Sequence, residues 1–365
     1  MIVATVQWRG WWRWTTVMPV IALVALLLSW QRHPGALVLA VEAVLLVGAV
    51  LAAVNHAEVI AHKVGEPFGS LILAVAVTVI EVALIVTLMV SGKGDTSTLA
   101  RDTVFAAVML TMNGIVGISL LVGALKYHLA VFNPEGSGSA LGSVITLAAL
   151  TLVLPRFTTS EPGPRLVSSQ LMFVAVASLL VYGLFVFTQT VRHRDFFLPP
   201  GEGEADDTHA GPPSNRATLA SVILLLVSLV SVVGLTKVES PAIEAGVAWL
   251  GFPPSFVGVI IAVMVLMPES IAAVRAASHN RTQISVNLGY GSAMASIGLT
   301  IPTLAIASHW LPSELNLGLE PMQIVLLVSS AIVAVLTVVP GRAKTLHASL
   351  HLVLLAAFIF LAIVP

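Results

Sequence analysis

The sequence has 365 residues, of which 57% are hydrophobic and only 10% are charged, and its mean hydropathy is +0.99. Soluble domains carry about 25% charged residues, so this composition predicts a protein whose surface mainly faces lipid. The net charge of −1 gives no basis for nucleic-acid binding, and the absence of cysteine excludes disulfides, thiolate metal sites and thiol nucleophiles.

Apolar segments long enough to cross a membrane follow one another along the chain. A transmembrane helix needs about 20 mostly apolar residues. The Trp- and Arg-rich stretch 1–16 predicts an interfacial anchor, and breaks rich in Gly, Pro and charge separate the segments that follow. Eleven segments result: 17–30, 36–54, 68–90, 103–125, 140–155, 167–190, 217–236, 255–274, 285–308, 322–339 and 345–364. The sequence therefore predicts an all-α polytopic membrane protein with about eleven transmembrane helices.

The distribution of positive charge predicts the orientation of these helices. Eleven of the 17 Lys and Arg residues fall in segments on the same side as the N-terminus, and six fall on the other side. Cytoplasmic loops carry an excess of Lys and Arg. We therefore expect a multi-pass protein of the bacterial inner (plasma) membrane, with a cytoplasmic N-terminus and an external C-terminus.

The two halves of the chain resemble each other. When Glu81 is aligned with Glu269, Phe68 falls on Phe256. We expect four parts: 1–35, the anchor and first span; 36–191, a five-helix repeat; 192–216, an acidic cytoplasmic linker; and 217–365, a second five-helix repeat. Because five is odd, the second repeat enters the membrane in the opposite direction. One helix plus two inverted repeats is a plan typical of secondary transporters.

Glu81 and Glu269 are the main candidates for transport chemistry. Each lies deep inside its predicted span, in or just beyond the middle of the hydrocarbon. An ionised side chain there costs at least about 2.5–3.5 kcal/mol, which favours a functional role over a merely structural hydrogen bond. Carboxylates are hard oxygen ligands that suit Ca²⁺, Na⁺, Mg²⁺ or H⁺. We therefore expect these two residues to bind cations and protons.

Neutral groups near these glutamates complete the predicted site. Ca²⁺ takes about 6–8 oxygen ligands, and two glutamates supply at most four. Pro268 has no N–H, so it leaves the carbonyl of Met264 free one turn earlier. Helix packing is the competing interpretation for each neutral side chain. The candidates are Met264, Thr78, Asn113, Ser292 and Ser296, of which Asn113 aligns with Ser292 in the span that follows each glutamate.

The predicted linker carries a cluster of acids. Either this Pro- and Gly-rich segment is a solvated linker that does not fold, or it senses cytoplasmic cations. The spacing is not that of an EF-hand, so we expect regulation rather than transport from it. The residues concerned are Glu202, Glu204, Asp206, Asp207 and His209.

Three other groups of polar residues are weaker candidates. Glu42 lies near the start of the second span, where its side chain can extend to the membrane surface. His56 and its neighbours up to His62 predict an interfacial face, with a cation or proton antechamber as the alternative. His347 and His351 have i, i+4 spacing but lack the glutamate of an HExxH zinc site. An intramembrane enzyme therefore has little support, and a non-transporting scaffold is the remaining rival.

At this point the sequence resembles a known family. The run from His56 to Leu73, leading to Val79-Ile80-Glu81, is similar to the bacterial ChaA-type calcium/proton antiporters of the calcium:cation antiporter superfamily. Pro268-Glu269, Gly291-Ser292 and Pro302 agree in the second half. The resemblance covers essentially the whole chain.

The resemblance implies a fold and an activity. The fold is one helix plus two inverted five-helix repeats, with Glu81 and Glu269 binding cation and proton in turn and with Asn113 and Ser292 at the matching polar positions. The wider branch has a Gly-Asn pair before each glutamate, where this chain has Val77-Thr78 and Val265-Leu266. The implied activity is export of cytoplasmic Ca²⁺ in exchange for H⁺, without a cofactor. Its partners are the lipid bilayer and inorganic cations. The alternative is a Na⁺(K⁺)/H⁺ antiporter with Ca²⁺ as a secondary substrate.

Overall fold

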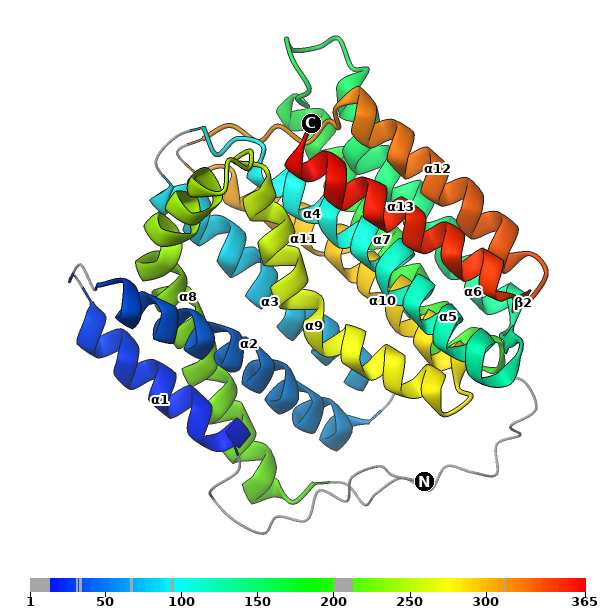
Figure 1. The fold of residues 1–365 in the computed structure, drawn as a ribbon, viewed down its shortest axis with the longest axis horizontal. Helices are drawn as coiled ribbons and strands as arrows, with labels where there is room; N and C mark the ends of the chain where they lie inside the picture. Colours follow the sequence, from blue (N-terminus) through cyan, green and yellow to red (C-terminus); the bar gives the residue numbers. More distant parts are fainter. Residues whose placement is uncertain are drawn as a thin grey trace. The chain divides into compact units, whose positions relative to one another are not determined.

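The computed structural model describes residues 14–30, 32, 35–65, 68–92, 95–199, 213–311 and 313–365. Within these ranges ten helices are long and apolar enough to cross a membrane, and α1 (Trp14–Ser29) is a shorter apolar helix. The predicted all-helical, multi-pass membrane fold is therefore confirmed (Figure 1).

The chain forms two compact units. The described residues within Met1–Leu88 and Gly201–Ala242 make up the first unit, and those within Met89–Pro200 and Ile243–Pro365 make up the second. These units are defined by contacts, whereas the predicted repeats are defined by sequence similarity. The units therefore do not test the repeat boundaries, which stay a prediction.

The first unit contains the N-terminal helices and most of one later helix. In it α1 packs against α2, as Figure 1 shows in blue. Its elements are α1, α2 (Ala36–Val64), α3 (Phe68–Ser91) and α8 (Asn215–Trp249), of which α3 from Met89 and α8 from Ile243 are counted in the second unit.

The second unit contains the remaining helices. Its first-half elements are α4 (Leu99–Met109), η1 (Leu110–Ile115), α5 (Val116–Tyr127), β1 (Ala130–Val131), α6 (Pro134–Ala148), η2 (Ala149–Val153), η3 (Leu154–Arg156), α7 (Ser168–Phe187), η4 (Thr188–Arg192) and η5 (Arg194–Phe197). Its second-half elements are α9 (Phe256–Ser278), α10 (Thr282–Gly298), α11 (Thr300–Ala307), α12 (Pro321–Val338), β2 (Arg342–Ala343) and α13 (Thr345–Ile363).

Two helices extend well beyond their predicted spans. Helix α2 continues to Val64, and α8 runs for 35 residues to Trp249 with Pro241 inside it. A proline removes one backbone hydrogen bond, which helices in membrane proteins can accommodate without ending. In contrast, the predicted span 285–308 is interrupted at Leu299, between α10 and α11. Pro302 explains this break, because it has no N–H to offer the carbonyl of Gly298.

The helices differ in how much of their surface is enclosed. In the span Leu99–Tyr127, which joins α4, η1 and α5, 83% of the apolar window is buried, against 17% in α13. The buried residues of α13 are Ala348, His351 and Phe358, and large apolar side chains such as Leu346 and Phe360 are exposed. Such a pattern is typical of a helix with one narrow face toward protein and the rest toward lipid.

A short β-ladder closes one end of the second unit. Ala130 pairs with Ala343 and Val131 with Arg342, in antiparallel register. The N–H of Phe132 also donates to the carbonyl of Gly341 at 3.0 Å. Gly341 has a φ of +65°, a conformation that glycine adopts without strain. The ladder therefore joins the connection after α5 to the connection after α12.

Candidate functional site

Glu81 lies on α3 in the first unit, just past the middle of that helix. From Phe68, the first residue of α3, the rise to Glu81 is about 20 Å along the helix axis. Its side chain is buried, with 2% of its surface exposed. Thr78 lies one turn earlier and is also buried, and its hydroxyl oxygen has no hydrogen-bond partner among the described residues. A buried carboxyl and an unused hydroxyl oxygen therefore lie within one helical turn.

Glu269 occupies the corresponding place on α9 in the second unit. The separation between Phe256 and Glu269 equals that between Phe68 and Glu81, and each phenylalanine is the first residue of its helix. Glu269 is half-buried and Met264 is buried. Helix α9 continues through Pro268, so no N–H four residues on faces the Met264 carbonyl. Glu81 thus belongs to the first unit and Glu269 to the second.

Asn113 lies in a π-helical segment, η1, between α4 and α5. A π-bulge inserts a residue into a helix, and such bulges occur frequently at functional sites. Helices α9 and α10 both contact η1 and also contact each other. The three predicted site residues of this unit, Glu269, Asn113 and Ser292, therefore come from three mutually packed elements. Ser292 is half-buried on α10, and Ser296, one turn further, is buried.

The side-chain amide of Asn113 is the centre of a buried polar chain. Its Nδ2 donates to the Ser330 hydroxyl at 2.8 Å, and its Oδ1 faces Nδ1 of His351 at 3.1 Å. The other ring nitrogen, Nε2, lies 3.2 Å from the Thr337 hydroxyl. All four side chains are at most 1% exposed. These hydrogen-bonded side chains connect η1 with α12 and α13, and the latter two helices lie side by side in Figure 1.

Sequence reasoning identifies Asn113 but not the other three members of this polar chain, Ser330, His351 and Thr337. The one sequence signal for His351 is its i, i+4 spacing from His347, and this spacing points only to a zinc-protease pattern. In the structure the two histidines have different roles, since His347 Nδ1 accepts from the Lys344 N–H at the start of α13. Ser330 and Thr337 are single hydroxyls in an apolar helix, and hydroxyls of this kind often bond to their own backbone. Both do so, to Leu326 and Val333.

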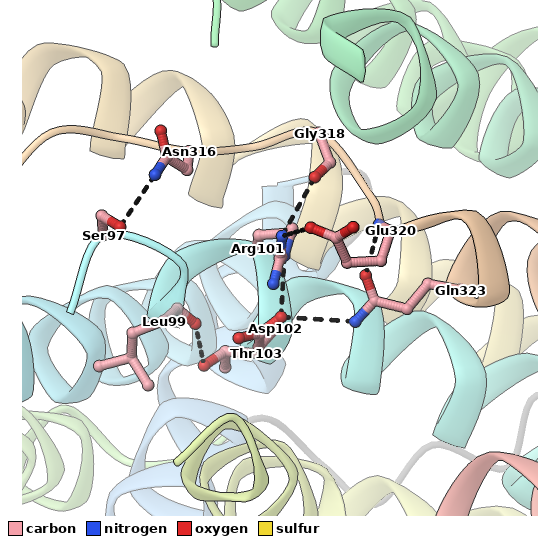
Figure 2. A network of polar contacts seen from close by, with 9 residues as sticks. All are labelled: Ser97, Leu99, Arg101, Asp102, Thr103, Asn316, Gly318, Glu320 and Gln323. Carbon is pink, nitrogen blue, oxygen red and sulfur yellow. Dashed lines mark hydrogen bonds and ion pairs between the residues drawn. The ribbon is translucent and has the colours of Figure 1, made fainter. Parts of the chain in front are cut away.

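A second polar network joins α4 to the segment before α12 (Figure 2). The Arg101 guanidinium contacts Asp102 at 2.9 Å, the Gly318 carbonyl at 3.2 Å and Glu320 at 3.3 Å. Gln323 donates to Asp102 at 3.5 Å. Because both acids are compensated by Arg101 and stand at helix N-termini, where negative charge is favourable, this network acts as a structural brace.

A loop acid lies beside this network. The N–H of Ser97 donates to Asp95 at 2.9 Å. Hydrogen bonds from the Ser97 hydroxyl and N–H stabilise the carboxylate and lower the pKa of Asp95, which is exposed. The loop before α4 is thus held by local bonds rather than by charge pairing.

The acidic cluster of the predicted linker is the remaining candidate. Glu202, Glu204, Asp206, Asp207 and His209 lie outside the described residues. Among the described residues no group of three or more His, Cys, Asp or Glu could hold a metal ion.

Two polar residues of the first unit lie elsewhere than we expected. Glu42 does not extend to the surface; it is 1% exposed and accepts a hydrogen bond from Ser29. His56 is also buried, and its ring contacts the Ser221 hydroxyl at 3.3 Å and the Thr15 carbonyl at 2.9 Å. Polar partners on α1 and α8 make burial of both side chains possible.

Comparison with known proteins places these features in a family. The model of the family described as sodium/calcium exchanger protein matches residues 34–191 and 220–364. The putative ionic transporter y4hA of Sinorhizobium fredii (strain NBRC 101917 / NGR234) is 40% identical over 96% of each chain. The sodium-potassium/proton antiporter ChaA of Escherichia coli (strain K12) is 34% identical over 94% of each chain. The solved structure of the H⁺/Ca²⁺ exchanger CAX superposes with a TM-score of 0.72 at 15% identity, covering 95% of this chain and 86% of that one.

Proposed function

The chain belongs to the sodium/calcium exchanger protein family, and from this premise we propose that it exports cytoplasmic Ca²⁺ in exchange for H⁺. As a member, it is a multi-pass membrane cation exchanger and thus a secondary transporter rather than an enzyme. The predicted resemblance to ChaA-type antiporters is correct.

The proposed transport groups are Glu81 and Glu269, which bind the cation and protons in turn. The observation that carries this proposal is their matched placement, at the same separation from the first residue of α3 and of α9. The buried, unpartnered hydroxyl of Thr78 one turn from Glu81 supports it, because a cation at that carboxylate needs further oxygen ligands.

Further ligands would come from the neighbours of Glu269 in the second unit. The Met264 carbonyl faces no N–H at Pro268, and Ser292 lies on α10, which contacts both α9 and η1. Asn113 is bonded to Ser330 and His351. We assign Asn113 a double role, since its Oδ1 has a second lone pair beyond the one that faces His351.

Coupling to protons fits the energetics of calcium export. Moving two positive charges outward against 100 mV costs about 4.6 kcal/mol, at about 2.3 kcal/mol per charge. Two protons returning for each Ca²⁺ would cancel this electrical cost. Carboxylates that release a cation when they take up protons give this exchange without a further cofactor.

One observation favours a second candidate, a Na⁺(K⁺)/H⁺ antiporter with Ca²⁺ as a secondary substrate. The Escherichia coli relative is named as a sodium-potassium/proton antiporter. In addition, Thr78 and Leu266 stand just before the two glutamates, at positions without an amide side chain. Fewer strong oxygen ligands suit monovalent ions better than Ca²⁺.

The repeat layout and the orientation are part of the proposal. The two stretches matched by the family model, 34–191 and 220–364, begin and end within three residues of the predicted repeats. The excess of Lys and Arg supports a cytoplasmic N-terminus and linker. We further propose that the acidic cluster 202–209 adjusts cytoplasmic cation affinity and does not carry ions.

Cation-dependent proton flux in everted membrane vesicles tests this function. Vesicles with the full chain are energised, and Ca²⁺, Na⁺ and K⁺ are added in turn while a pH-sensitive dye reports proton release. We expect the largest response to Ca²⁺ and none in vesicles that carry the double variant Glu81→Gln/Glu269→Gln. A larger response to Na⁺ or K⁺ would select the second candidate, and no response to any cation would refute antiport.

A further inference from the structure

A second pair of buried acids lies in the first unit, away from Glu81 in sequence. The register of three helices brings the pair together. At one end of the unit His56 on α2 contacts Thr15 on α1 and Ser221 on α8. Further along, Gly234 on α8 packs against the side chain of Leu26 on α1, leaving no room for a β-carbon. Helices α1 and α8 therefore run in the same direction, with α2 antiparallel to both.

This register leads to Glu42 and Glu239. Ser29 follows Leu26 by one turn on α1, and Glu239 follows Gly234 by about 7.5 Å along α8. The Ser29 hydroxyl donates to Oε1 of Glu42 on α2. Both acids thus lie at the level where α1 ends, and Glu239, a whole number of helical turns after Ser221, faces α2 as Ser221 does.

Both carboxyls are buried and incompletely bonded. Glu42 is 1% exposed and Glu239 is 3% exposed. Neither Oε2 of Glu42 nor Oε1 of Glu239 has a hydrogen-bond partner among the described residues. Burying a polar atom without a partner is costly, and burying an unpaired charge costs far more. The pair therefore needs a hydrogen-bond donor between the two carboxyls, and none of the described residues supplies one.

No described cation reaches this pair. Lys237, less than one turn before Glu239, is exposed, and its ammonium lies 5.3 Å from the centre of the Trp30 ring. Arg32 is exposed. Helix α1 carries no titratable side chain, and the one on α3 is Glu81. The remaining ionisable groups of α2, from His56 to Lys63, lie more than three helical turns from Glu42.

We propose that Glu42 and Glu239 form a proton-binding site, in which one proton is held between α2 and α8. Two neighbouring buried carboxyls cannot both ionise, so one stays protonated and donates to the other. Glu42 already accepts a hydrogen bond from Ser29 at one oxygen and is therefore the acceptor of the pair. The proton therefore resides on Glu239, and it satisfies both oxygen atoms that otherwise lack partners.

A proton fits this pair better than a metal ion does. Two carboxylates and the Ser29 hydroxyl offer at most five oxygens, whereas Ca²⁺ takes about 6–8. The site also stands apart from the proposed transport glutamates, because it does not require Glu81 or Glu269. The shared proton would link α2 and α8, the first helices of the two proposed repeats. This link does not depend on whether the proposed ion exchange is correct.

Infrared spectroscopy of the purified full-length protein in detergent tests the proposal, with the proton as the only ligand and without Ca²⁺, Na⁺ or K⁺. All variants carry Glu81→Gln/Glu269→Gln as a common background, so that the two proposed transport carboxyls contribute no band. At neutral pH this background protein should show the carbonyl stretch of one buried, protonated carboxyl. Adding Glu239→Gln should remove this band. Adding Glu42→Gln should make the band disappear at lower pH than in the background protein, because the neighbouring negative charge is gone. The control Glu161→Gln alters an exposed acid in the loop before α7 and should leave the band unchanged.

Ser29→Ala keeps both acids and provides a milder variant should Glu239→Gln fail to fold. Removing the hydrogen bond to Glu42 should shift the frequency of the band without abolishing it. A spectrum of the Glu81→Gln/Glu269→Gln background protein without a protonated carboxyl at neutral pH would overturn the site. So would a band that persists in Glu239→Gln or is unmoved in Ser29→Ala. A shift of the carboxylate bands on adding Na⁺ or Ca²⁺ at constant pH would assign the pair to a cation if the shift is absent in Glu42→Gln. This outcome would also overturn the proposal.

Discussion

His351 presents each of its two ring nitrogens to an oxygen atom, Nδ1 to Asn113 at 3.1 Å and Nε2 to Thr337 at 3.2 Å. The hydroxyl of Thr337 donates to Val333, so its oxygen accepts. The Asn113 amide donates to Ser330 through Nδ2, so the atom facing the ring is its carbonyl oxygen. A neutral imidazole has one N–H, so the ring can donate to only one of these two oxygens at a time. The tautomer of His351 decides which oxygen that is.

Removing this ring should destabilise the second unit. His351→Ala leaves the buried polar groups of Asn113 and Thr337 without their ring partner, and a buried polar group left unsatisfied costs about 1–3 kcal/mol. We expect a clearly lower thermal unfolding temperature of the purified protein in detergent. Ser349→Ala, a half-buried change on the same helix outside the network, serves as the control. Equal unfolding temperatures for the two variants would contradict an energetic role of the network.

Neutralising either proposed transport glutamate should abolish exchange without preventing insertion. In Glu81→Gln and Glu269→Gln the side chain keeps its size but can no longer alternate between a cation and a proton. The measurement is cation-dependent proton flux, normalised to the amount of protein in the membrane. Glu161→Gln, at an exposed acid in the loop before α7, should retain flux. Near-normal flux in both single variants would rule out the two-glutamate mechanism.

The predicted orientation can be tested by cysteine labelling, because the native chain has no cysteine. A cysteine at Thr208 should resist impermeant thiol reagents in intact cells, since the Lys and Arg excess assigns that segment to the cytoplasm. A cysteine added after Pro365 should react. Both positions should react once the membrane is made permeable, and the opposite pattern in intact cells would reverse the topology.

A single methyl group between α4 and α9 should loosen the second unit. A β-carbon on Gly258 would lie 2.8 Å from the backbone of Asp102 and of Thr103. Backbone atoms cannot move aside as a flexible side chain does, so Gly258→Ala should cost about 1–3 kcal/mol. Thermal unfolding in detergent measures this cost. Gly142→Ala, where no atom lies within 4 Å of the added carbon, should be nearly neutral.

The helical architecture follows from the sequence because its cause is local. Apolar runs of about 20 residues, with Gly- and Pro-rich breaks, determine where a chain can cross a bilayer. The ends of helices are harder to predict from the sequence. The predicted span ends before Pro241, which lies inside α8, whereas Pro302 coincides with a real interruption. Whether a proline ends a helix depends on its surroundings, which a single sequence does not contain.

The buried polar contacts cannot be predicted for a related reason. His351 and Asn113 lie in opposite halves of the chain, and so do Glu42 and Glu239. Each residue alone is ambiguous, since a Glu near a helix end can extend to the surface and a lone His can be an ordinary core residue. Only the packing of distant helices decides between these outcomes. The positions of Glu81 and Glu269 are different, because the repeat itself marks them.

The two-residue ladder between β1 and β2 has a mechanical consequence. It fastens the turn leading to α6 to the turn leading to α13, so neither helical hairpin can slide past the other at that end without breaking backbone hydrogen bonds. Such bonds are individually modest, but several must break together. The ladder therefore holds the two connections together at this end of the helices. Any relative movement of the helices would be smallest at the ladder and largest at their opposite ends.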